Sequence, residues 1–182
     1  MNNTENGTPK QYGELLGTML AHSGMNLIEN RFYWKYIANS SSAQARNEFL
    51  NVYTGFMISA VALSFRSNLG HRDCHQEITN AMIERIATVY SFTYGGSTQE
   101  IVNSISIDFS CIKGDASNRN TIIMGLVSAI SMQEGLFVQK NNLDAVMQFA
   151  SYVKDIMSPV LDTVERTTIY KTNREYTVYW RS

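Results

Sequence analysis

A long apolar run, from Leu50 to Phe65, constrains the fold more than any other feature of this sequence. Its apolar residues fall on nearly every face of a helix, and a helix of that kind is normally buried at the centre of a bundle. Polar residues such as Asn51 and Ser64 interrupt the run, so we do not expect it to span a membrane. The sequence therefore predicts a central buried helix over about residues 42–68, which Gly70 would terminate.

Helical periodicity recurs on both sides of this run. Apolar residues at helical spacing predict further helices over about 10–20, 25–37, 73–94, 117–137 and 142–157. Pro159 would either kink the last of these helices or start a short new one. Gly13 and Gly17 weaken the first helix, but small residues there would let a neighbouring helix approach closely.

Two stretches show strand character instead. Residues 104–112 alternate between apolar and polar side chains, which favours a strand, although Ile101, Ile105 and Phe109 also fit one face of a helix. Residues 167–180 are rich in strand formers on either side of a polar turn, which predicts a C-terminal hairpin.

The predicted fold class is therefore mainly α (α+β). We expect about six helices packed around the central buried helix, with a small antiparallel sheet from residues 104–112 and the C-terminal hairpin. Residues 1–9 are polar and contain Gly7 and Pro9, so we expect a flexible N-terminal tail. Residues 10–182 then form a single helix-rich domain, because no repeat or change of composition marks a second one.

Composition narrows the classes of function. Charged residues make up 17% of the 182 positions, below the usual figure of about 25%, and a weakly charged surface favours self-association or docking of a protein partner. The net charge of −1 does not favour nucleic-acid binding. No phosphate-binding or dinucleotide-binding motif is present, so no cofactor is expected. The start of the chain lacks a secretory pattern, and we expect a cytoplasmic protein that does not bind membranes.

Aromatic residues crowd two segments of the chain. Tyr33 and Trp34 lie in one of them, and Tyr179 and Trp180 lie at the other, near the C-terminus. Aromatic side chains that cannot all point inward are enriched at protein interfaces, although core packing also accounts for many of them. We take these four residues as candidate partner-binding residues. The leading hypothesis is a non-enzymatic interaction or self-associating module.

A short motif supplies the alternative. Residues 66–71 read RSNLGH, an R-x4-H spacing between Arg66 and His71. This motif resembles that of the HEPN ribonucleases, helical bundles that usually cleave RNA across a dimer interface. The resemblance implies that Arg66 would hold the scissile phosphate and that His71 would transfer protons. The residue after the arginine, often Asn in that family, is Ser67 here.

The same residues also fit an ordinary helix end. Gly70 would then stop the helix, Arg66 would favour its C-terminal dipole and His71 would be a solvated loop residue. Both interpretations stay open at this point. A metal site is not expected, because His71, Asp73, Cys74 and His75 lie too close together in sequence to supply a tetrahedral set.

Overall fold

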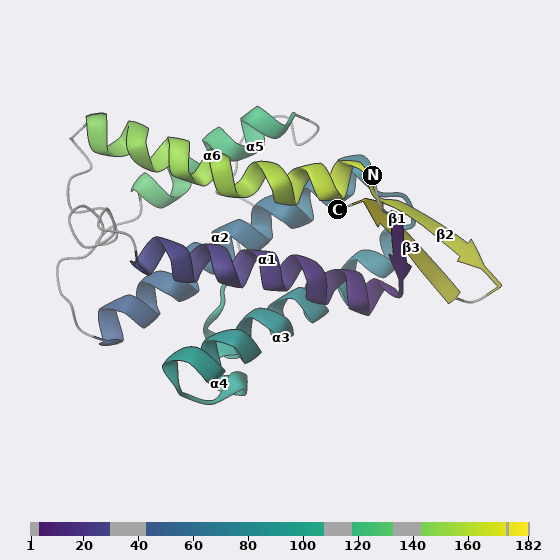
Figure 1. Cartoon of the computed structure of the whole chain (residues 1–182), viewed down its shortest axis with the longest axis horizontal. Helices are drawn as coiled ribbons and strands as arrows, with labels where there is room; N and C mark the ends of the chain where they lie inside the picture. Colours follow the sequence, from purple (N-terminus) through teal and green to yellow (C-terminus); the bar gives the residue numbers. More distant parts are fainter. Residues whose placement is uncertain (1–3, 30–42, 108–117, 133–142, 174, 182) are drawn as a thin grey trace.

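Six α-helices and three strands make up the described part of the chain (Figure 1). The computed structural model describes residues 4–29, 43–107, 118–132, 143–173 and 175–181. The helices are α1 (Pro9–Glu29), α2 (Ala43–Asn68), α3 (His75–Tyr94), α4 (Thr98–Ser104), α5 (Arg119–Met132) and α6 (Leu143–Glu165), and a short 3-10 helix, η2 (Arg72–Cys74), precedes α3. The strands are β1 (Thr4–Gly7), β2 (Thr168–Thr172) and β3 (Glu175–Arg181). The predicted mainly α (α+β) class is confirmed.

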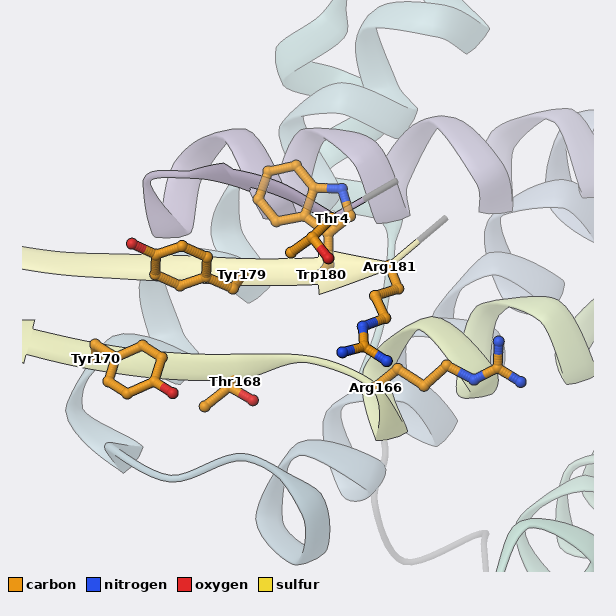
Figure 2. A pocket seen from close by; sticks show the side chains of 7 residues that line it. All are labelled: Thr4, Arg166, Thr168, Tyr170, Tyr179, Trp180 and Arg181. Carbon is orange, nitrogen blue, oxygen red and sulfur yellow. The ribbon is translucent and has the colours of Figure 1, made fainter. Parts of the chain in front are cut away.

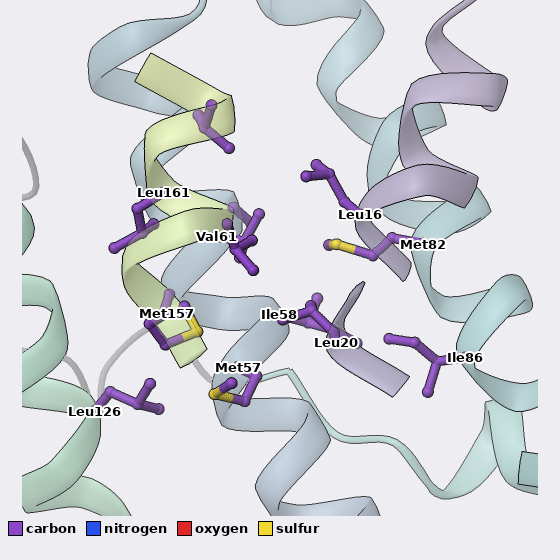
Figure 3. Packing of buried hydrophobic residues seen from close by; sticks show 14 of the residues in the cluster. Leu16, Leu20, Met57, Ile58, Val61, Met82, Ile86, Leu126, Met157 and Leu161 are labelled. Atoms are coloured by element: carbon purple, nitrogen blue, oxygen red, sulfur yellow. The ribbon is translucent and has the colours of Figure 1, made fainter. Parts of the chain in front are cut away.

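The central helix is where the sequence predicts it. α2 contacts α1, α3, α5 and α6, and its residues Met57, Ile58 and Val61 are fully buried. Figure 3 shows these side chains between those of the surrounding helices. By length and composition α2 could cross a membrane, since an 18-residue window within Arg46–Asn68 has a mean hydropathy of 1.3, but 78% of that window is buried inside the fold. Burial against four neighbours explains why the run is apolar on every face.

Glycines bring α1 and α3 together, as the sequence suggests. A Cβ atom added at Gly13 would lie 2.4 Å from the carbonyl oxygen of Ile78, and one added at Gly17 would lie 2.6 Å from that of Met82. Both distances are far below van der Waals contact, so only glycine permits this separation of the two backbones. The result is the most extensive helix pair in the described structure.

Two buried tyrosines connect the helices through hydrogen bonds. The hydroxyl of Tyr53 lies 3.3 Å from Ser23 Oγ on α1, and that of Tyr90 lies 3.1 Å from Thr54 Oγ1 on α2. Burial raises the pKa of each phenol, so both stay neutral and can donate or accept a hydrogen bond. Pairing these hydroxyls avoids the cost of an unsatisfied polar group in the core.

The prediction of a strand over residues 104–112 is not met where the structure describes it. Thr98–Ser104 form α4, and residues 105–107 run on without pairing to any described strand; residues 108–112 lie outside the described part. The backbone of this segment crosses α2 at Gly55, where an added Cβ would lie 2.1 Å from Ser106 O. Ile105 is thus buried by packing on a helix, and the apolar–polar alternation reflects that contact rather than a sheet.

The C-terminal hairpin forms as predicted, but its partner is the N-terminus. β2 and β3 pair antiparallel, and β3 also pairs with β1 in the sheet order β1-β3-β2. Residues 4–7, expected to belong to a flexible tail, are therefore a strand. Gly7 allows this, because an added Cβ would meet Trp180 at 3.0 Å and Gln11 at 2.6 Å.

Some predicted helix ends lie outside the described residues. These are 30–37, after α1, and 133–137, after α5. Of the alternatives for Pro159, a new helix does not begin there, because α6 continues from Leu143 to Glu165.

Candidate functional site

The strands of the sheet alternate between an inner and an outer face. On β3, Val178 and Trp180 are buried against the helices, whereas Tyr179 and Arg181 are exposed. The register places Thr168 opposite Tyr179 and Thr4 opposite Arg181, and opposed residues share a face. We call this exposed side of the sheet the outer sheet face; its residues are Thr4, Asn6, Thr168, Tyr170, Thr172, Glu175, Thr177, Tyr179 and Arg181.

Two tyrosines form a pair on the outer sheet face. Tyr170 is 57% exposed and Tyr179 is 37% exposed. Their ring centroids are 5.4 Å apart with the planes at 86°, an edge-to-face contact. Such a pair adds about 0.5–1.5 kcal/mol beyond area burial. It also presents two large aromatic surfaces toward solvent.

A shallow cleft of about 500 Å³ lies beside this pair (Figure 2). Its lining residues are Thr4, Arg166, Thr168, Tyr170, Tyr179, Trp180 and Arg181. In Figure 2 the side chain of Arg181 extends from the end of β3 toward the end of α6, where Arg166 follows the last helical residue. The cleft thus combines two cations, two phenols and two threonine hydroxyls, and its described lining residues include no carboxylate.

The four sequence-predicted partner residues have different outcomes. Tyr179 is exposed at the cleft, whereas Trp180 is only 6% exposed. The centroid of its ring lies 5.4 Å from the ring centroid of Tyr12. Trp180 therefore belongs to the core, and its ring is not presented to a partner in this structure. Tyr33 and Trp34 lie outside the described residues.

Tyr170, Arg166 and Arg181 were not among the site residues predicted from the sequence. Strand alternation was the signal that could have found Tyr170 and Arg181, because in a hairpin the residues two apart share a face. Arg166 follows α6 and lies two residues before Thr168 of β2, so its place at the cleft depends on where α6 ends and β2 begins.

The R-x4-H residues lie at the other side of the sheet. Arg66 is exposed in the last turn of α2, and His71 is exposed after Gly70 with a left-handed backbone at φ 55°. The ring centroids of His71 and of Tyr176 on β3 lie 5.7 Å apart. The structure thus gives His71 a contact with the hairpin, and the ribonuclease hypothesis stays a prediction from sequence.

A polar cluster beside His71 attaches the hairpin to the helices. Lys171 Nζ donates to Asp73 Oδ2 at 3.3 Å and to the Tyr176 hydroxyl at 2.7 Å, and that hydroxyl also bonds Asp73. A hydrogen bond from its own backbone N–H, together with Lys171, lowers the pKa of the Asp73 carboxyl. Because these groups are exposed, we interpret the cluster as a surface contact between η2 and the hairpin.

No metal centre is found among the described side chains, where no three His, Cys, Asp or Glu residues converge. Cys74 is buried, and its thiol donates to the backbone oxygen of His71 at 3.0 Å. Burial raises the pKa of this thiol to about 11, so it is a structural rather than a reactive cysteine. Cys111 lies outside the described residues.

Comparison of the chain with protein-family models, curated proteins and solved structures finds no match.

Proposed function

We propose that the chain is a non-enzymatic protein–protein interaction module that binds a different protein through its outer sheet face. The observation that carries this proposal is the exposed edge-to-face pair of Tyr170 and Tyr179 beside a cleft with two arginines. Tyrosine and arginine are enriched among the residues that dominate binding energy at protein interfaces.

The rigidity of the tyrosine pair supports this function. A tyrosine has few rotatable bonds, so it offers a large contact area at a small cost in conformational entropy. Packing against each other holds Tyr170 and Tyr179 in position before any partner binds. Preorganised contacts of this kind lose less entropy on association than flexible side chains do.

The charge of the cleft favours a different protein over a second copy of this chain. In a two-fold dimer each subunit uses the same patch. A two-fold contact centred on the cleft would bring Arg166 and Arg181 of both copies together without a carboxylate from the cleft between them. Like charges at an interface are unfavourable, so a complementary surface on another protein is the better fit.

Site-specific photocrosslinking in the cells that naturally express the chain tests the proposal. A photoreactive benzoylphenylalanine replaces Tyr170, and a matched control places it at Thr88, an exposed position on α3. We expect position 170 to crosslink to one defined protein and position 88 not to do so. Mass spectrometry of the crosslinked peptides identifies the contact.

A second variant checks that the crosslink reports the proposed surface. Tyr179→Ser in the position-170 probe should abolish the crosslink, because it removes the remaining tyrosine, whose ring packs on the side chain at position 170. Equal crosslinking from positions 88 and 170, a crosslink only between copies of the chain, or none at position 170 would each overturn the proposal.

A further inference from the structure

The two arginines of the cleft carry no ion pair with any described residue. Among the described residues, the ion pairs join Arg119 to Asp162, Arg119 to Glu165 and Lys171 to Asp73. Asp162 and Glu165 are the acidic residues nearest to Arg166 in sequence, and Arg119 on α5 holds both of them. Arg166 and Arg181 are therefore cations available to an outside ligand, and both are exposed.

We propose that the cleft binds an extended acidic segment of the protein partner, and this inference rests on the proposed function. Carboxylates of that segment pair with Arg166 and Arg181, since guanidinium groups form strong hydrogen bonds with carboxylates. An apolar side chain beside those carboxylates packs on Tyr170 and Tyr179. The outward hydroxyl of Thr168 lies between the two groups of contacts.

The directions of the arginines favour a segment over a single small anion. In Figure 2 the Arg181 side chain extends toward α6, whereas that of Arg166 extends along α6 and away from the sheet. The two guanidinium groups thus extend in different directions, which favours a ligand with several anionic groups over a single phosphate. Successive carboxylates of an extended chain provide such groups, because side chains recur every 6.6 Å or so on one side of a strand.

The charge of the whole chain favours a protein over a nucleic acid. Polynucleotide binding gains affinity from many phosphate contacts and usually needs a basic surface. This chain has 15 basic and 16 acidic residues, and the cleft contributes two cations. Two arginines are enough to recognise a short acidic segment but few for a polyanion.

NMR titration of the isotope-labelled full chain tests this inference. The probe is a blocked peptide with a phenylalanine between two pairs of glutamates, and the matched probe carries glutamine at every glutamate position. We expect the glutamate peptide to shift the amide signals of Thr168, Tyr170 and Tyr179, and the glutamine peptide to bind about tenfold more weakly or worse. Inorganic phosphate and a short oligothymidine are titrated in parallel.

Variants identify the groups responsible. Arg166→Gln combined with Arg181→Gln should weaken glutamate-peptide binding about tenfold or more. The control, Lys10→Gln combined with Lys154→Gln, makes the same change of charge at exposed positions of α1 and α6 and should leave the affinity unchanged. Retained dispersion in the amide spectrum of each variant shows that it folds.

Three results would overturn the inference: equal binding of the two peptides, equal loss in both double variants, or tighter binding of phosphate or oligothymidine than of the glutamate peptide. The crosslinking experiment separates this from the proposed function. A crosslinked partner at position 170 together with equal binding of the two peptides removes the acidic segment and leaves the interaction module. Failure of both experiments removes both proposals.

Discussion

Tyr12 and Thr167, which are 155 positions apart in the sequence, share a buried hydrogen bond of 3.0 Å. It joins the first turn of α1 to the residue immediately before β2, so one contact ties the start of the bundle to the start of the C-terminal sheet. Desolvation by burial raises the pKa of the Tyr12 phenol, which therefore stays neutral.

Removal of this hydroxyl should destabilise the fold without changing its shape. Tyr12→Phe leaves the ring in place but deprives Thr167 of one partner, and we expect the free energy of unfolding to fall by about 1 kcal/mol. Tyr170→Phe is the control, because its hydroxyl is on an exposed ring. Urea denaturation measures both variants, and an equal effect would contradict the assigned role of the buried bond.

Close packing of α1 on α3 should make Gly13 intolerant of any side chain. In a helix interior, alanine is more stable than glycine by up to about 1 kcal/mol. At position 13, however, the Cβ of alanine would lie 2.4 Å from Ile78 O. We expect Gly13→Ala to destabilise the chain by about 1–3 kcal/mol, because the helices must separate to admit it. Gly70→Ala, where no atom lies within 4 Å of the added Cβ, should cost much less in thermal unfolding.

Neighbouring residues of β3 should respond in opposite ways to substitution. Trp180→Ala should cost about 3–5 kcal/mol, because it removes a core ring packed on Tyr12. Tyr179→Ser should cost clearly less than Trp180→Ala, because it removes a partly exposed ring and an aromatic pair worth about 0.5–1.5 kcal/mol beyond area burial, while it should abolish partner crosslinking. Equal destabilisation by the two variants would contradict the assignment of inner and outer faces.

His75 should make stability depend on pH. The ring centroids of His75 and Phe65 lie 5.7 Å apart, and burial lowers the pKa of the imidazole below its usual range. As pH falls through about 6.5 the unfolded chain binds a proton there before the folded chain does. The free energy of unfolding therefore keeps its full contribution from His75 well above this pH. It declines as pH falls from 7 toward the lower pKa of the folded chain.

His75→Gln should flatten this part of the stability profile, since glutamine does not titrate. Urea denaturation between pH 7 and pH 5, with the His75 ring signals followed by NMR, measures the effect. An unchanged slope in the variant, or a folded pKa for His75 above that of the unfolded chain, would be incompatible with the stated cause.

Local patterns predicted the helical part of the fold well. The apolar run at Leu50–Phe65 avoids water only if the helix is buried on all sides, as α2 is. Gly70 follows the end of α2 as expected. The residues Thr8, Pro9 and Gln11 also carried a signal for the start of α1 that was not used. Thr8 and Gln11 exchange hydrogen bonds in a capping box, a motif recognisable in sequence.

The sheet and the candidate site depended on the tertiary structure. Alternation at residues 104–107 could not distinguish a strand from a segment packed across α2 at Gly55, because both bury every second side chain. The pairing of β1 with β3 also could not be predicted from local patterns, since β1 is short and polar and is joined to β3 through long-range contacts.

The sequence by itself determined that this chain buries one apolar helix inside a helical bundle and ends in a hairpin, because hydrophobic periodicity acts over neighbouring residues. Only the tertiary structure decided which side of β3 faces water and which arginines lie beside it. That choice depends on how the sheet docks against α1 and α6, and the contact between Tyr12 of α1 and Thr167 joins residues 155 positions apart.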